Sequence, residues 1–197
     1  MSLLRRANEL RSRLKGRSPE ELAACTGAQY DPSRNEFSLF IWGKEFNLSF
    51  PGFETPSSSP SALALLLYYF VTADGLPLSG RWISFGDLDG GRFYNQAFQG
   101  YTGGELARSF RNDRERFMKA AFLNGGILTP NAPGDVAYFY QALPRVPLLL
   151  IYWEGDEDFP ASYQVLFDAV TSHYLPTDAC AILGSTLTGK IKKAGAA

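Results

Sequence analysis

The side chains best suited to chemistry lie close together in one block of the sequence, residues 147–178, PLLLIYWEGDEDFPASYQVLFDAVTSHYLPTD. An apolar segment ends at Trp153, and an acidic cluster follows at once, made up of Glu154, Asp156, Glu157 and Asp158. Asp168 and His173, the one histidine of the chain, come next. Polar groups that follow the end of a strand are typical of binding and catalytic sites. The block is therefore the first candidate site.

The acidic cluster has the ligand type, but not the spacing, of a calcium loop. In an extended segment Glu154, Asp156 and Asp158 project on one side, where their carboxylate oxygens could hold a hard divalent cation. A loop of the EF-hand type is longer and ends in glutamate, whereas this segment runs into Phe159 and Pro160. We therefore predict no metal site. Contact with a ligand or partner stays open, and so does a structural role in which Asp158 caps a helix that Pro160 begins.

His173 is the candidate for a general base, a metal ligand or the axial ligand of a tetrapyrrole, the roles that imidazole fills in proteins. A carboxylate enzyme would use Glu154 or Asp168 as acid or base with His173 as its partner. No second histidine stands at the spacing of a zinc-binding helix, and no serine stands in a nucleophile-elbow motif. Near the end of a helix, a single histidine could instead complement the helix dipole. The sequence leaves both interpretations open.

Aromatic side chains, 14% of the chain, are the second resource for binding. Those that could line a pocket for a flat ligand are Trp42, Trp82, Trp153, Tyr94, Tyr101, Tyr138 and Tyr140. Arg81 could add an anion contact beside Trp82, and Asp87 could add a polar contact, although turn formation is its ordinary role. We expect the pocket between residues 81–104 and residues 153–173. Its predicted ligand-binding residues are Arg81, Trp82, Asp87, Trp153, Glu154, Asp156 and His173.

Composition excludes several classes of protein. A net charge of −1 gives no overall attraction to nucleic acid or to an anionic membrane. The apolar run 62–71 is about half as long as a transmembrane helix and indicates a buried helix instead. No secretory signal is visible, so we expect a cytoplasmic protein. Cys25 and Cys180 are too few for a disulfide scaffold or a cysteine-only cluster, and we expect free thiols.

A mixed set of elements must position these residues. Helical patterns occupy 2–15, 19–27, 60–74, 102–109, 113–123, 160–173 and 177–193, and strand patterns occupy 36–50, 81–85, 136–142 and 147–153. The first strand pattern indicates a hairpin that turns at Gly43 and Lys44. The last two are antiparallel neighbours because their connection is short, and the consecutive apolar residues of 147–153 indicate a central strand.

These patterns predict one α+β domain with a mainly antiparallel sheet and flanking helices. The predicted domain spans residues 1–197. Residues 1–28 would form an N-terminal helical segment, and residues 29–197 would form the core.

Four stretches of the sequence carry a family resemblance: LPLSGRWISFGDLDGG, FYNQAFQGYTGGELARSF, DVAYFYQALPRVPLLLIYWEGDEDFPASYQVLFD and HYLPTDACAILGSTL. Together they resemble the family catalogued as domain of unknown function 3786, over most of the chain beyond residue 62. The resemblance implies a source among anaerobic bacteria and archaea. Some members resemble fusions in which a four-cysteine iron–sulfur module, like that of corrinoid iron–sulfur proteins, precedes this domain. Here the N-terminal region holds one cysteine, Cys25, and cannot carry such a cluster alone.

Three functions follow as hypotheses. The first is a non-catalytic accessory domain that binds a ligand or a partner. Its candidate cofactor is a corrinoid or other tetrapyrrole, and its candidate partner is a protein of anaerobic one-carbon or corrinoid metabolism. The second is an enzyme that uses Glu154 or Asp168 as acid or base with His173 as its partner, which requires these groups within about 3 Å of one another or of a substrate. The third is an interaction module that docks on another protein through its acidic segment 154–158 or through the basic helical stretches 5–17 and 108–119.

Overall fold

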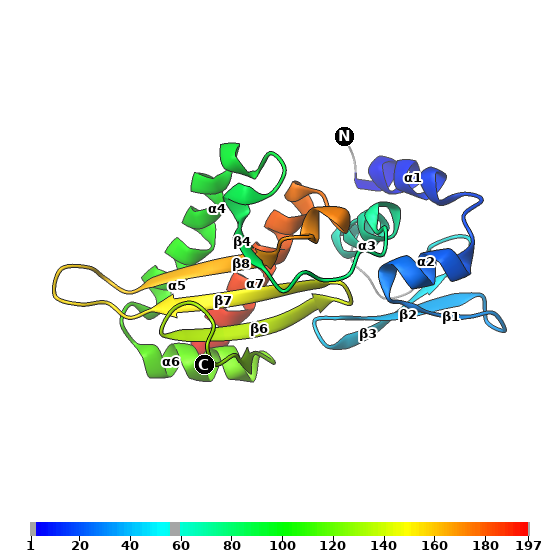
Figure 1. Ribbon diagram of the computed structural model, residues 1–197. Coiled ribbons are helices and arrows are strands. Elements are labelled where there is room, and N and C mark those ends of the chain that lie inside the picture. Colours follow the sequence, from blue (N-terminus) through cyan, green and yellow to red (C-terminus); the bar gives the residue numbers. More distant parts are fainter. Residues whose placement is uncertain (1–2, 56–59, 197) are drawn as a thin grey trace.

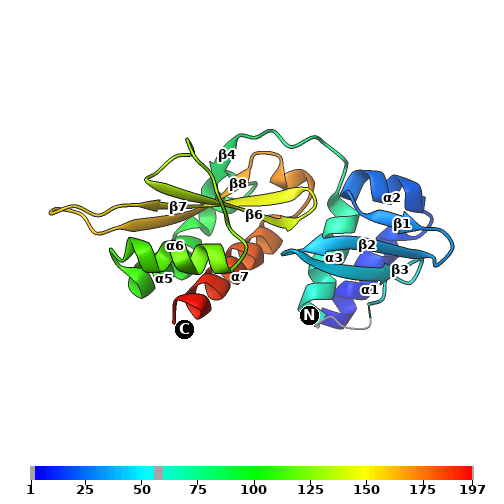
Figure 2. The same ribbon diagram turned by 90° about the horizontal axis from the view of Figure 1, so that it is seen from below.

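Helices and an aromatic hairpin from the first third of the chain form the N-terminal lobe (Figures 1 and 2). Its elements are α1 (Leu3–Leu14), α2 (Pro19–Thr26), β1 (Gln29–Asp31), β2 (Glu36–Ile41), β3 (Lys44–Ser49) and α3 (Pro60–Thr72). The structure, a computed structural model, describes residues 3–55 and 60–196, so residue 2, where the first helix was predicted to begin, lies outside the described residues. At α2 the Ser18 hydroxyl accepts a hydrogen bond from the Glu21 N–H at 3.3 Å, as an N-cap does.

The turn between β2 and β3 lies one residue before its predicted position. Ile41 pairs with Lys44, so Trp42 and Gly43 form the two-residue loop, with φ angles of 51° and 73°. Two positive φ angles define a type I′ turn, whose twist matches that of the strands. The prediction of a turn at Gly43 and Lys44 is therefore wrong by one position, because Trp42 adopts a left-handed conformation that bulky residues rarely take.

The C-terminal lobe is built on a five-stranded sheet in the order β4-β8-β7-β6-β5, with antiparallel pairing throughout. Its strands are β4 (Trp82–Ser84), β5 (Ile127–Leu128), β6 (Val136–Leu143), β7 (Val146–Trp153) and β8 (Ser162–Asp168). β7 lies at the centre and seven of its eight residues are buried, which confirms the predicted central strand. The predicted antiparallel pairing of β6 with β7 is also confirmed.

Residues 162–168 form strand β8, and the helix predicted over 160–173 is wrong. That prediction relied on a helical spacing of apolar residues. Tyr163, Val165 and Phe167 alternate instead, with the period of a strand, and all three are buried. β8 pairs with β4 on one side and β7 on the other, so its backbone groups are satisfied by two neighbours. This pairing outweighs a weak helical pattern.

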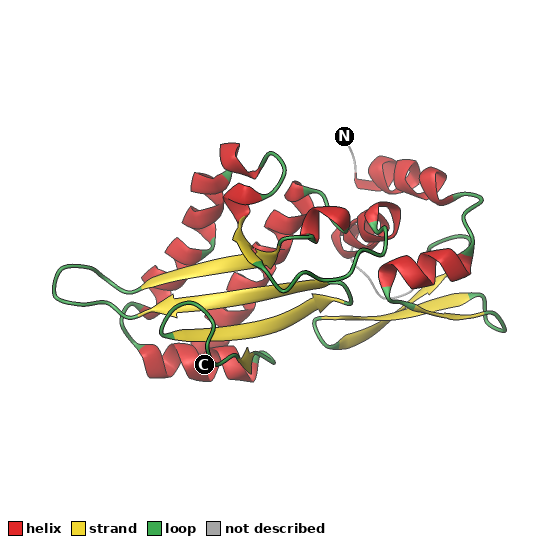
Figure 3. Cartoon of the chain, viewed as in Figure 1, coloured by secondary structure: helices red, strands yellow, loops and turns green. Residues whose placement is uncertain are grey.

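Helices cover one face of the five-stranded sheet, and loops lie over the other (Figures 1, 2 and 3). They are α4 (Asn95–Tyr101), α5 (Gly103–Phe110), α6 (Arg114–Leu123) and α7 (Thr177–Gly195), with short 3-10 helices η1 (Phe85–Asp87), η2 (Gly91–Phe93) and η3 (Thr171–His173). The predicted helices that correspond to α5, α6 and α7 are confirmed, whereas α4 was not predicted. Gly184 allows α4 to approach α7, because a Cβ at this position would lie 2.6 Å from ring carbons of Phe98.

The two lobes are joined by hydrogen bonds as well as by one shared hydrophobic core. The Trp42 N–H donates to the Ala142 carbonyl at 3.0 Å. The buried Tyr69 hydroxyl of α3 donates to the Thr26 carbonyl at 2.5 Å and accepts from the Arg145 N–H at 3.0 Å. The predicted α+β class is confirmed. Within the described ranges, no helix has the length and apolar character needed to span a membrane.

Candidate functional site

The residues predicted to form one site lie at opposite ends of the five-stranded sheet. Trp153 pairs with Ser162 at one end of β8, and Trp82 pairs with Asp168 at the other end. Six residue steps along a strand separate the two ends by about 20 Å. The acidic cluster that follows Trp153 is therefore far from Asp168. The acid–base pairing of this cluster with the histidine beyond Asp168 does not meet the distance that the enzyme hypothesis requires.

The acidic cluster shapes its own loop. Oδ1 of Asp156 accepts hydrogen bonds from the N–H groups of Asp158 and Phe159, at 2.9 and 2.7 Å. Glu154 forms an exposed ion pair with Arg114 at 3.3 Å. Asp158 caps no helix, because residues 162–168 form a strand. The cluster thus acts mainly as a turn-forming and solvated segment.

Asp168 is a buried structural acceptor. Its Oδ1 accepts from the Ser79 N–H at 3.2 Å, the Ser79 hydroxyl at 2.8 Å and the Val170 N–H at 3.0 Å, and its Oδ2 accepts from the Gly80 N–H at 2.8 Å. Burial opposes ionisation of this carboxyl, but the hydrogen bonds outweigh burial, so the pKa of Asp168 is lowered. A carboxylate held ionised in this way fastens the connector between the lobes, residues 73–81, and is a poor proton donor.

His173 also fastens the connector. Its Nδ1 lies 2.6 Å from Oδ2 of Asp74, and both side chains are about half exposed. The hydrogen bond from His173 lowers the pKa of Asp74. The neighbouring Tyr174 donates its hydroxyl to the Leu76 carbonyl of the same connector. The imidazole therefore helps to fix the position of the connector.

The other two predicted ligand-binding residues lie near β4. Asp87 accepts hydrogen bonds from the hydroxyl and the N–H of Ser84, at 2.7 and 3.0 Å, and the hydroxyl contributes most to a lowered pKa of Asp87. Arg81 is exposed. Asp87 therefore forms a local turn, the alternative role considered in the sequence analysis.

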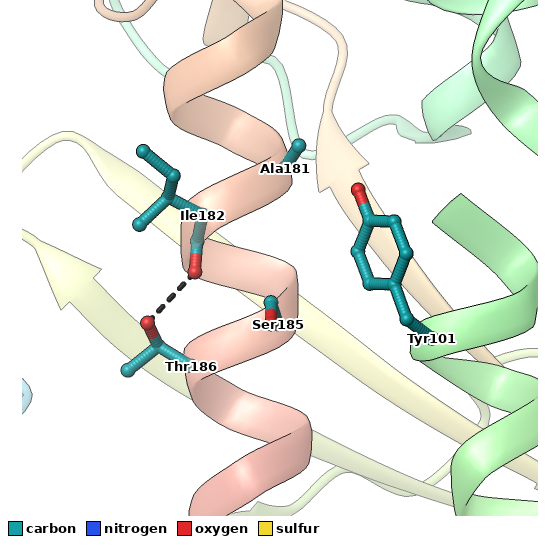
Figure 4. A pocket seen from close by; sticks show the side chains of 5 residues that line it. All are labelled: Tyr101, Ala181, Ile182, Ser185 and Thr186. Atoms are coloured by element: carbon teal, nitrogen blue, oxygen red, sulfur yellow. Dashed lines mark hydrogen bonds between the residues drawn. The ribbon is translucent and has the colours of Figure 1, made fainter. Parts of the chain in front are cut away.

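Three adjoining cavities follow the exposed side of α7 and together form what we call the α7 groove. At its start, the α4 cavity of about 420 Å³ is lined by Phe85, Asp89, Gly90, Tyr94, Ala97, Tyr101, Thr177, Asp178 and Ala181. The middle cavity, about 360 Å³ and shallow, is lined by Tyr101, Ala181, Ile182, Ser185 and Thr186 (Figure 4). At its end, the hairpin cavity of about 320 Å³ is lined by Ile41, Trp42, Lys44, Phe46, Ala62, Leu65, Ile182, Thr186 and Lys190.

The cavities are continuous because neighbours share lining residues. Tyr101 and Ala181 line both the α4 cavity and the middle cavity, and Ile182 and Thr186 line both the middle cavity and the hairpin cavity. Figure 4 shows the Tyr101 side chain pointing from its helix toward α7. From Asp178 to the far end, twelve helical positions span about 18 Å. The groove thus has α7 as its floor, α4 as one wall, and α3 with the hairpin at the other end.

The two ends of the groove carry opposite charge. Asp89 and Asp178 line the α4 cavity, whereas Lys44 and Lys190 line the hairpin cavity. Nζ of Lys190 lies 5.8 Å from the centre of the Trp42 ring. All four charged groups are exposed or half-buried, so their fields act on whatever enters the groove.

Aromatic rings give the groove its apolar surface. Tyr94 and Tyr101, which line the α4 cavity, are 68% and 40% exposed. Burial raises the pKa of Tyr101, so its hydroxyl stays protonated at neutral pH and could donate a hydrogen bond. Aromatic walls with a few polar groups are typical of binding sites.

The predicted pocket and the α7 groove have one wall in common. The segment 81–104, predicted to line the pocket, supplies most of the α4 cavity. The opposite wall is α7, not residues 153–173, and none of the seven predicted ligand-binding residues lines the three cavities. Two signals could have indicated α7: the small residues Ala181, Ser185 and Gly189 recur at four-residue intervals, and Ile182 lies beside them.

The lining of the groove contains no histidine, cysteine or methionine, three of the usual axial ligands of a tetrapyrrole metal. The chain has one histidine, His173, which bonds Asp74 and is not part of the groove lining. Across residues 3–55 and 60–196, no group of three or more histidine, cysteine, aspartate or glutamate side chains is placed to hold a metal ion. We derive no chemistry through a tetrapyrrole or a metal.

Comparison with known proteins agrees with the resemblance seen in the sequence. The chain matches the model of the family described as Domain of unknown function (DUF3786) over residues 18–190. No curated protein and no solved structure matches the chain.

Proposed function

The chain belongs to the DUF3786 family, and we propose that it is a non-catalytic binding domain whose ligand or partner docks in the α7 groove. The observation that carries this proposal is the run of three adjoining cavities with aromatic walls, open along one side of α7. All three exceed the roughly 300 Å³ at which ligand pockets begin. An occupant of the whole groove would touch both lobes.

The chemistry of the groove favours binding over catalysis. The hydroxyls of Thr177 and Thr186 donate to the carbonyls of Asp89 and Ile182, at 2.6 and 2.7 Å. A nucleophilic hydroxyl must instead donate to a general base within hydrogen-bond reach, and these two hydroxyls donate to main-chain carbonyls, which are not bases. Exposed rings and hydroxyls instead supply contact area and orientation.

We place this binding role in the cytoplasm of an anaerobe, beside a protein of one-carbon or corrinoid metabolism. The resemblance to members fused with an iron–sulfur module supports that setting. In such a setting the domain would serve as an accessory to a partner that carries the cofactor.

Fluorescence of anilinonaphthalene sulfonate (ANS) tests the proposed groove. ANS is a flat, anionic probe whose emission rises in apolar surroundings, which suits the hairpin cavity with Trp42 and Lys190. Ile182 is 50% exposed and lines two of the cavities. We expect Ile182→Glu to reduce ANS affinity at least tenfold, since it places a carboxylate in the path of the sulfonate.

The matched control is Leu128→Glu. Leu128 is similarly exposed, at 55%, but lies on β5 and outside the groove. The control variant should bind ANS as the unmodified chain does. Equal loss in both variants, or no loss in either, would show that ANS binds elsewhere and would refute the groove as the binding site.

A further inference from the structure

We propose that the α4 cavity binds an organic cation, an ammonium or guanidinium group, which sits between Tyr94 and Tyr101 and faces the carboxylates of Asp89 and Asp178. This inference rests on the proposed function and adds the chemical class of the occupant. It concerns one end of the α7 groove, so it can fail while the groove as a whole remains a binding site.

The first support is the exposure of two aromatic rings on a concave surface. Tyr94 is 68% exposed and Tyr101 is 40% exposed, and both line a cavity of about 420 Å³. Most other rings of the C-terminal lobe pack against one another, as Phe85 does with Phe98 at a centroid distance of 4.1 Å, and the exposed rings Phe93, Phe122 and Phe159 do not line this cavity. Rings that present their faces to a cavity attract cations through the quadrupole of the π-system.

The second support is the sign of the charge that lines the cavity. Its lining contains two carboxylates and no lysine, arginine or histidine. Arg81 and Arg92 are near in sequence but outside the lining, and the field of both lowers the pKa of Asp87, which also lies outside it. Asp178 stands in the first turn of α7, where its Oδ1 accepts from the Ala179 N–H at 2.9 Å, and the residue is exposed.

The third support is the contrast with the hairpin cavity. That end of the groove is lined by Lys44 and Lys190 and by no carboxylate. An elongated occupant would therefore lie in one direction, with its cation in the α4 cavity and any anionic group about 18 Å away near Lys190. Charge complementarity of this kind determines orientation and suppresses reversed binding.

Choline and its neutral carbon isostere, dimethylbutanol, test the inference. The two have nearly the same shape, so a difference in affinity reports the charge. Aromatic NMR signals of Tyr94 and Tyr101 serve as the readout, because both rings line the cavity. We expect choline to bind in the millimolar range and the isostere to bind at least about fivefold more weakly, as a cation–π contact with neighbouring carboxylates requires.

Variants locate the effect. Asp178→Asn keeps the acceptor for the Ala179 N–H but removes the charge, and Asp89→Asn does the same for the second carboxylate; each should weaken choline binding about threefold to tenfold. Asp156→Asn, which removes a carboxylate outside the groove, should leave choline binding unchanged. Acetyl-lysine amide and acetyl-arginine amide, tested beside choline, distinguish a side chain of a partner protein from a free amine.

Two outcomes would overturn the inference. Equal affinity for choline and dimethylbutanol would show that the cavity recognises shape alone. Unchanged choline binding in both asparagine variants would show that the carboxylates do not act on the occupant. If either result occurs while Ile182→Glu still weakens ANS binding, the groove is supported and the cation site is refuted. If choline binds as expected but ANS affinity does not change in Ile182→Glu, the cation site is supported and the continuous groove is refuted.

Discussion

Replacing Asp168 by asparagine should destabilise the fold far more than the same replacement at an exposed aspartate. Asp168 is 1% exposed, and its two oxygens accept four hydrogen bonds from residues 79, 80 and 170. In Asp168→Asn the amide oxygen can keep the three donors at Oδ1. The amide NH₂ then replaces Oδ2 and faces the Gly80 N–H, so that one donor loses its acceptor and the remaining bonds lose their charge.

The magnitude follows from these contacts. Hydrogen bonds to a charged group contribute about 1.5–3 kcal/mol, against about 1 kcal/mol for neutral pairs. One lost charge-assisted bond and three weakened ones, partly offset by relaxation of the connector, give an expected loss of about 2–4 kcal/mol in the free energy of unfolding. Urea denaturation near neutral pH measures this loss.

The pH dependence adds a second, independent criterion. The pKa of Asp168 in the folded chain is lowered from its ordinary value of 3.8, because its hydrogen bonds outweigh burial. Its contribution is therefore complete above that value and is lost as the pH falls below it toward the folded pKa. The difference between Asp168→Asn and the unmodified chain should shrink below about pH 4.

Asp156→Asn is the matched control for this prediction. Oδ1 of Asp156 also accepts two backbone N–H groups, but the side chain is exposed and an asparagine oxygen can accept both. We expect it to change stability by less than about 0.5 kcal/mol. Equal effects of the two substitutions, or a loss at Asp168 that does not change with pH, would refute the role assigned to this carboxylate.

Three further predictions follow from particular contacts. Gly184→Ala should lower the free energy of unfolding by about 1–3 kcal/mol, because the added Cβ would lie 2.6 Å from the buried Phe98 ring, and this outweighs the better helix propensity of alanine. A thermal melt that shows stabilisation would contradict this close packing. His173→Ala should lower the free energy of unfolding, measured by urea denaturation, by at most about 1 kcal/mol, since its pair with Asp74 is half exposed. It should leave ANS binding unchanged, and a loss of ANS binding would show that His173 belongs to the binding site. With a thiol reagent under native conditions, Cys25 should react and Cys180 should not, because Cys180 is fully buried and burial raises its pKa, and rapid labelling of both would contradict that burial.

The sequence predicted the elements whose patterns are local. Consecutive apolar residues marked β7 as central, and Ser18 with Pro19 marked the start of α2. β8 was mistaken for a helix because residues 162–168 also fit a helical spacing, and only its two neighbouring strands decide between the periods. A local sequence pattern does not show which strands lie on either side of a segment.

The candidate site was less predictable for the same reason. Polar residues near Trp153 and His173 are close in sequence, but the strand between them separates their positions by about 20 Å. The groove depends instead on how α7 packs beside α4 and the N-terminal hairpin, which are about 80 and 140 residues away in sequence. The small residues on α7 can be interpreted as groove lining only when the positions of α4 and the hairpin are known.

Backbone NMR during an ANS titration tests the binding groove most directly, because one experiment reports on amide groups along the whole of α7 and the hairpin. Our account predicts that amide signals shift along residues 181–190 of α7 and at residues 41–46 of the hairpin, the segments that line the middle and hairpin cavities. Shifts confined to residues 122–128, where Phe122, Leu123, Ile127 and Leu128 are also exposed, would contradict it.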